Sequence, residues 1–137
     1  MKIIETENHR LCIARIQVDD AGRTVSRIGK GLQIVNAECW KHVVFAVILA
    51  LRAFERGTNH ARTVNGEILL RLAGTLQIAE AIREHGARPG ENFAVAYGDR
   101  CEERLRELLN GKELPLGECR DENLKSLFER AALVEVL

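Results

Sequence analysis

A long apolar stretch in the first half of the chain constrains its fold more than any other feature. Between residues 43 and 54 almost every side chain is apolar, and only Arg52 interrupts the run. The pattern predicts a helix over 38–56 that stops at Gly57, because glycine commonly closes a helix. A helix that is apolar nearly all round is buried on more than one side. Either this helix is the central helix of the domain, or a partner covers part of it.

The same stretch is too short to cross a bilayer, which takes about 20 apolar residues. The opening residues, MKIIETENHR, contain no apolar segment of the kind found in signal peptides. The chain has 137 residues, near the commonest size of one domain, and 46% of them are hydrophobic. We therefore expect a cytoplasmic protein with one domain over 1–137 and no membrane partner.

The rest of the chain alternates between strand and helix patterns. Apolar alternation and turn residues predict strands over 2–6, 9–18, 32–37, 93–98 and 131–137. Helical periodicity predicts helices over 23–30, 38–56, 61–72, 76–85, 99–110 and 121–130. This order predicts an α/β (α+β) fold with one mixed or antiparallel sheet of about five strands and helices packed on it. Gly74 separates two of the helices and marks a break or a close backbone approach.

The four cysteines, Cys12, Cys39, Cys101 and Cys119, are scattered and form no C-x-x-C pair. Without a secretory signal we expect reduced and mostly buried thiols. Cys39 and His42 lie three residues apart on the predicted long helix and so share a face. The pair suggests one alternative function, a small thiol-dependent enzyme with Cys39 as nucleophile and His42 as base. No second pair has metal-ligand spacing, so we expect no metal. We also expect no cofactor and no small-molecule substrate.

Basic residues near the helix ends are more informative than the cysteines. The net charge is zero, which argues against nucleic-acid binding by bulk charge alone. Lys41 and His42, however, lie in the first turns of the predicted long helix, a place that favours anions rather than cations. Arg71 precedes the break at Gly74, where backbone N–H groups could face a phosphate. Glu67 is most simply an acid in the first turn of its helix.

Two segments, LQIVNAECWKHVVFAV and GEILLRLAGTLQIAEAI, resemble the archaeal type of the TPRKB-like small subunit of the KEOPS (EKC) complex. The matching pieces are Gln33 to Ala37, Lys41 to Val43, and Glu67 to Ile82. The closing segment, Phe128 to Val136, is also similar to the last helix and strand of that family. The resemblance covers most of residues 30–137, so the chain is expected to be a single domain of this small-subunit kind.

The resemblance implies a non-catalytic accessory subunit. Members of this family bind the N-terminal lobe of a small Rio-type protein kinase within KEOPS, which makes the threonylcarbamoyl modification of tRNA. Archaeal members also hold the single-stranded 3′ CCA end of the tRNA. The expected partners are therefore that kinase and tRNA. A member of the same fold that binds only protein is the other alternative.

The predicted sites follow the matching segments and the basic residues. We expect six residues to line the RNA site: Asn36, Lys41, His42, Arg71, Gly74 and Gln77. For the kinase we expect the helix over 76–85, with Ile78 and Ile82 as contact residues. One apolar face is marked by Leu72, Leu76, Ala79 and Ile82. Ile78 lies off this face, either exposed for a partner or buried by a neighbouring helix. The chain departs from the family at Ala73 and Leu76, where the family has serine and arginine.

Overall fold

A computed structural model describes residues 1–137 of the chain, apart from the side chain of Asp121. The chain divides into two compact units, and each unit is built from two separate stretches of sequence. Unit 1 consists of residues 1–36 and 87–116, and unit 2 consists of residues 37–86 and 117–137. The expectation that these residues form a single domain stays a prediction.

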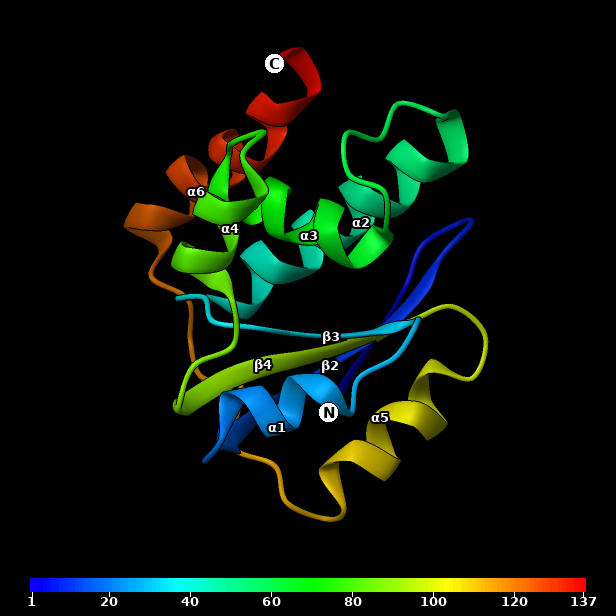
Figure 1. The fold of residues 1–137 in the computed structure, drawn as a ribbon, viewed down its shortest axis with the longest axis vertical. Helices are drawn as coiled ribbons and strands as arrows, with labels where there is room; N and C mark the ends of the chain where they lie inside the picture. The colour runs from blue at the N-terminus through cyan, green and yellow to red at the C-terminus, as the bar shows by residue number, and fades with distance from the viewer. The chain divides into compact units, whose positions relative to one another are not determined.

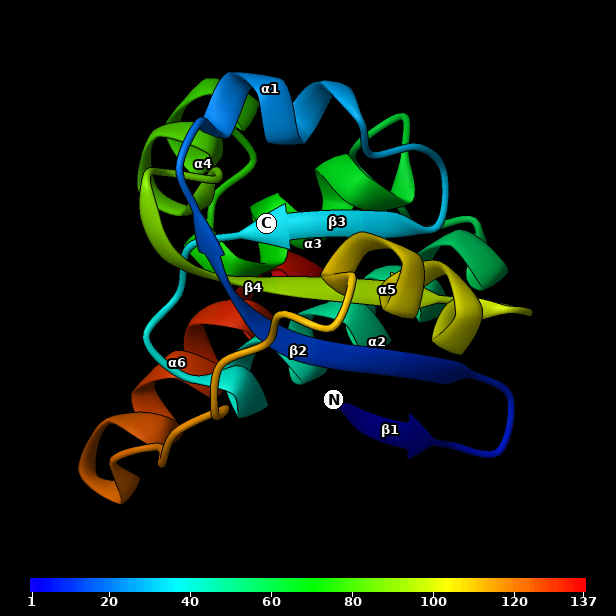
Figure 2. The same cartoon turned by 90° about the horizontal axis from the view of Figure 1, so that it is seen from below.

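Unit 1 contains an antiparallel sheet with the strand order β1-β2-β4-β3, seen in Figure 2. The strands are β1 (Lys2–Glu5), β2 (Arg10–Val18), β3 (Leu32–Val35) and β4 (Gly90–Tyr97). The predicted α+β class is confirmed, with four strands in the described residues where about five were expected. Because β2 and β4 are the inner strands, their side chains form the centre of the sheet.

One face of this sheet is covered by helix α5 (Cys101–Leu109). Ala21 of the short helix α1 (Ala21–Ser26) packs against the same core. The register pairs Cys12 with Ala96 and Ala14 with Ala94. Because side chains two residues apart on a strand point to the same face, these four small side chains all lie on the covered face. Small residues there let α5 approach closely. The resulting core is aliphatic and includes these buried side chains: Cys12, Ala14, Ile16, Val18, Leu32, Ile34, Ala94, Ala96, Cys101, Leu105 and Leu109.

Unit 2 is helical, and its helices lie side by side in Figure 1. They are α2 (Trp40–Arg56), α3 (Val64–Ala73), α4 (Ile78–His85) and α6 (Asp121–Leu133), followed by the 3-10 turn η1 (Val134–Val136). Helix α2 packs against both α3 and α6. The long helix predicted over 38–56 is therefore confirmed, and it is closed as expected by Gly57 in the left-handed conformation.

The strand predicted over 131–137 is wrong. Residues 131–133 continue α6, and Val134–Val136 form a 3-10 turn. Ala131 and Val134 are buried while Leu133 and Val136 are exposed, a spacing of three that belongs to a helix. The alternation in the sequence AALVEVL is compatible with both structures over so few residues.

None of the helices in the described part of the chain has both the length and the apolar content that a bilayer span requires.

Candidate binding site at the junction of helices α3 and α4

Gly74 ends helix α3 in the left-handed conformation, with φ of 68°. Its N–H donates to the Leu70 carbonyl over 2.8 Å. A β-carbon on Gly74 would lie 2.4 Å from Cγ and 3.0 Å from the carbonyl oxygen of Arg130 in α6. The close backbone approach predicted at this glycine is therefore confirmed, and the approaching group is the chain's own helix α6.

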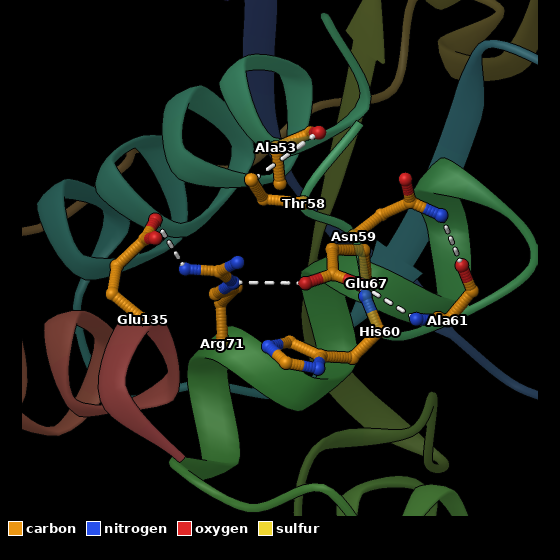
Figure 3. A network of polar contacts seen from close by, with 8 residues as sticks. All are labelled: Ala53, Thr58, Asn59, His60, Ala61, Glu67, Arg71 and Glu135. Atoms are coloured by element: carbon orange, nitrogen blue, oxygen red, sulfur yellow. Dashed lines mark hydrogen bonds and ion pairs between the residues drawn. The ribbon is translucent and has the colours of Figure 1, made fainter. Parts of the chain in front are cut away.

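Arg71, three residues before the junction, is fully buried. Its Nε donates to Glu67 Oε2 over 3.0 Å, and its Nη1 donates to Glu135 Oε1 over 2.7 Å, as Figure 3 shows. The guanidinium thus ties α3 to the C-terminal turn η1. Its burial is at odds with the predicted direct contact between Arg71 and RNA, because a phosphate cannot reach it without displacing these carboxylates.

Glu67 is the other fully buried member of this network. It lies in the first turn of α3, as expected. Its Oε1 also accepts hydrogen bonds from the backbone N–H groups of His60 and Ala61, each over 2.7 Å. The carboxylate therefore fixes the loop that connects α2 to α3, a role that only the apolar run after Glu67 could have hinted at in the sequence.

His42, in the first turn of α2, is also fully buried. Burial, together with the nearby His85 and Arg130, lowers its pKa from 6.5 to about 4. The rings of His42 and His85 meet edge to face, with their centroids 6.2 Å apart. His42 is therefore neutral at physiological pH and lies inside unit 2. Its side chain has no exposed surface through which it could make the predicted contact with RNA.

Cys39 forms a disulfide with Cys119, which corrects the expectation of four reduced thiols. The bond joins the N-terminus of α2 to the segment that precedes α6. A thiol-dependent enzyme would need a free Cys39 thiolate beside a basic imidazole. In this structure the sulfur is bonded, and the pKa of His42 is lowered, so the Cys39–His42 alternative lacks both its nucleophile and its base.

The other three predicted RNA-site residues of unit 2 lie at or near its surface. Lys41 is exposed, with Nζ 5.7 Å from the centre of the Trp40 ring. Gln77 is exposed and occupies the N-cap position of α4, where its N–H donates to Thr75 Oγ1 over 3.1 Å. Gly74 is partly exposed between them in sequence. Lys41, Gly74 and Gln77 are therefore open to a ligand.

Asn36, the sixth predicted residue, belongs to unit 1. Its Nδ2 donates to the Glu91 carbonyl over 3.0 Å, next to the start of β4. The side chain thus stabilises the end of the sheet.

Helix α4 presents an apolar surface instead of hiding one. Ala81 is its one fully buried residue among the described side chains, whereas Ile78 and Ile82 are 44% and 52% exposed. Leu76, just before the helix, is 40% exposed. The two isoleucines are four residues apart and so lie on the same face. The alternative that a neighbouring helix buries Ile78 is wrong.

Arg130 is a surface cation that no sequence pattern singled out. It is exposed, it packs across Gly74, and it contributes to the lowered pKa of His42. In sequence it is one basic residue in the last turn of a helix, which the helix dipole explains. Only the long-range contact of α6 with α3 places it at the junction.

The fold and this junction define an α+β protein with an exposed apolar helix next to a cation-bearing glycine turn. A family model described as kinase binding protein CGI-121 matches residues 34–136. The chain is also similar to the KEOPS complex subunit Cgi121 of Pyrococcus abyssi (strain GE5 / Orsay). The two are 42% identical over 141 aligned residues, which cover 98% of this chain and 82% of that protein. The chain belongs to the CGI-121 family, and the resemblance seen in the sequence is confirmed.

Proposed function

We propose that this chain is a non-catalytic accessory subunit of a KEOPS-type complex that binds a small Rio-type kinase through the exposed face of α4. The observation that carries the proposal is the pair Ile78 and Ile82, two large apolar side chains about half exposed on one helix face. Membership of a family described as kinase binding supports the same conclusion.

The energetics of α4 favour a docking role. Leaving large apolar side chains in water forgoes about 1.5–3 kcal/mol for each one that could be fully buried. An apolar stripe at helical spacing is the form in which a helix is commonly presented to a protein partner. Leu76, just before the helix, is a third large apolar side chain in water that a partner could cover.

Capture of the kinase by charge variants tests this proposal. Ile78→Glu and Ile82→Glu each put a charge into the contact, and we expect at least a tenfold loss of affinity for the Rio-type kinase in a pull-down or titration. Val25→Glu is the matched control, because Val25 is also 44% exposed on a helix and lies in unit 1. Full binding by the folded α4 variants would remove α4 from the interface.

We further propose that the α3–α4 junction holds the single-stranded 3′ end of tRNA. Lys41, Gly74 and Gln77 are carried over from the sequence, and Arg130 is added because it is an exposed cation on Gly74. Single-stranded ends are commonly bound by basic side chains together with backbone groups and a stacking surface. Trp40, beside Lys41, can supply the stacking surface. The buried Arg71 and His42 are left out as direct contacts and are assigned to positioning the junction.

The alternative in which the chain binds only protein is supported by that same burial of Arg71 and His42. The two functions differ in whether tRNA affinity depends on Lys41 and Arg130. A titration of tRNA against charge variants of these two residues decides between them.

A further inference from the structure

The cysteines follow the division of the chain into two units. Unit 1 is interrupted in sequence, and one cysteine lies in each of its stretches: Cys12 in residues 1–36 and Cys101 in residues 87–116. Unit 2 repeats the arrangement, with Cys39 in residues 37–86 and Cys119 in residues 117–137. In unit 2 the two cysteines are joined by a disulfide that closes the unit covalently. In unit 1 they are free thiols.

The two free thiols of unit 1 face each other. Cys12 lies on the inner strand β2, and Cys101 is the first residue of α5, which packs on that strand. Their Sγ atoms are 3.2 Å apart, about 1.2 Å more than the length of a disulfide bond. Both residues are buried in the same aliphatic core. The two sulfurs therefore have to approach each other by only about 1.2 Å to reach bonding distance.

We propose that Cys12 and Cys101 are the site of a second disulfide, so that in the oxidised protein each unit carries one cross-link between its two stretches of chain. The oxidant is a small peroxide. One thiolate attacks a peroxide oxygen, which gives a sulfenic acid and one water. The second sulfur then attacks the sulfenyl sulfur and expels hydroxide, which leaves as a second water. Two thiols and one hydrogen peroxide thus yield one disulfide and two waters.

The surroundings of the pair set its reactivity. Burial, together with the neighbouring Cys101 thiol, raises the pKa of Cys12 to about 12. Arg10 lowers it and Glu102 raises it, and these two side chains form an ion pair of 3.3 Å beside the thiols. Because the thiolate is the reacting form, oxidation is slow at neutral pH and accelerates as the pH rises. A small uncharged oxidant is needed because the sulfurs are closed to solvent.

The two disulfides would enclose overlapping segments of the chain. Along the chain the cysteines occur in the order 12, 39, 101, 119, so a bond between 12 and 101 and the bond between 39 and 119 enclose overlapping segments. Cross-links that close long segments restrict the unfolded chain strongly. The oxidised protein should therefore resist unfolding in both units. With the Cys39–Cys119 bond alone, only unit 2 has its two stretches cross-linked.

Peptide mapping of the full chain tests the proposal. The protein is reduced, treated with hydrogen peroxide, quenched, alkylated in denaturant and digested with trypsin. Each cysteine falls on its own tryptic peptide, because LCIAR, GLQIVNAECWK, CEER and ELPLGECR carry residues 12, 39, 101 and 119. We expect LCIAR linked to CEER, at a mass about 2 Da below the sum of the two. Re-formation of the bond between GLQIVNAECWK and ELPLGECR shows that the oxidant has acted.

Recovery of alkylated LCIAR and CEER beside a re-formed Cys39–Cys119 bond would overturn the proposal, as would linkage of either peptide to another cysteine. The double variant Cys39→Ala/Cys119→Ala isolates the pair and should melt roughly 5–15 °C higher when oxidised than when reduced. Adding Cys12→Ala to it should abolish this shift. Equal melting temperatures in the presence of the LCIAR–CEER product would contradict the expected restraint of unit 1, and the mapping itself does not depend on any variant.

Discussion

Arg71 Nε donates a hydrogen bond to Glu67 Oε2 over 3.0 Å, and neither side chain is exposed to solvent. Breaking a buried ion pair by removing one partner leaves an uncompensated charge, which typically costs about 3–5 kcal/mol. We therefore predict that Arg71→Met lowers the free energy of unfolding by about that amount. Urea unfolding followed by circular dichroism measures it.

Glu135→Gln is the control for this prediction. Glu135 also contacts Arg71, over 2.7 Å, but its side chain is 43% exposed, so loss of its charge should cost no more than about 1 kcal/mol. If Arg71→Met were as mild as Glu135→Gln, Arg71 would not be the centre of the network. A loss of tRNA binding by Arg71→Met therefore has to be read against its unfolding curve.

Gly74 is predicted to be intolerant of any side chain. A β-carbon there meets both the left-handed backbone, at about 1–2 kcal/mol, and the atoms of Arg130 at 2.4 and 3.0 Å. Overpacking of this kind adds about 1–3 kcal/mol. Gly57→Ala is a matched control, since Gly57 has φ of 72° and nothing within 4 Å of the added carbon. Equal losses of unfolding free energy for the two alanine variants would show that α6 does not press on Gly74.

The lowered pKa of His42 predicts that stability declines in mild acid. The unfolded chain protonates this histidine near pH 6.5, whereas the folded chain does so only near pH 4. The unfolded state therefore binds more protons between these values, and stability that is complete above pH 6.5 is lost as the pH falls toward 4. Each unit of pKa difference corresponds to 1.36 kcal/mol, so the difference between 6.5 and about 4 amounts to a loss of about 3 kcal/mol.

The comparison that isolates His42 is His42→Leu. Groups that do not interact with His42 contribute alike to both proteins, so the difference between the two unfolding free energies, measured from pH 7.5 to 4.5, follows His42 and its coupling to His85. His85 and Arg130 face the same ring and keep it uncharged, so both are left unchanged. Parallel curves for the two proteins would mean that the imidazole takes up its proton as easily when folded as when unfolded.

Local patterns predicted the elements of this fold well. The apolar run after Trp40 gave the correct long helix, and the class of the fold followed from the order of strands and helices. The predicted terminal strand was wrong because a short alternating segment fits two structures, and the burial of Val134 depends on tertiary packing. Local signals thus sufficed wherever a period extended over several turns.

The site was harder to predict because its residues are defined by partners far away in sequence. In the sequence Arg71 resembles a surface cation, but in the structure it is paired with Glu135, which lies 64 residues later. Cys39 looks like a free thiol until Cys119 is paired with it over 80 residues. Contacts between residues so far apart in sequence cannot be predicted from local residue spacing. Ile78 could be proposed as exposed because an apolar residue off the main stripe of a helix is itself a local signal, whereas Ile82 lay on the stripe.

The last prediction decides between the tRNA-binding and the protein-only function. We expect Lys41→Glu and Arg130→Glu each to weaken binding of tRNA that ends in a single-stranded CCA by about tenfold, because each variant replaces a phosphate contact with a repulsion. Each should also reduce the slope of log affinity against log salt concentration by about one. Arg52→Glu is the matched control, since Arg52 is an exposed cation on the same helix as Lys41, about three turns away. A tRNA trimmed of its 3′ end should lose the difference between control and variants. If all three proteins bound intact tRNA alike while Ile78→Glu still abolished kinase capture, the α3–α4 junction would serve protein contacts alone.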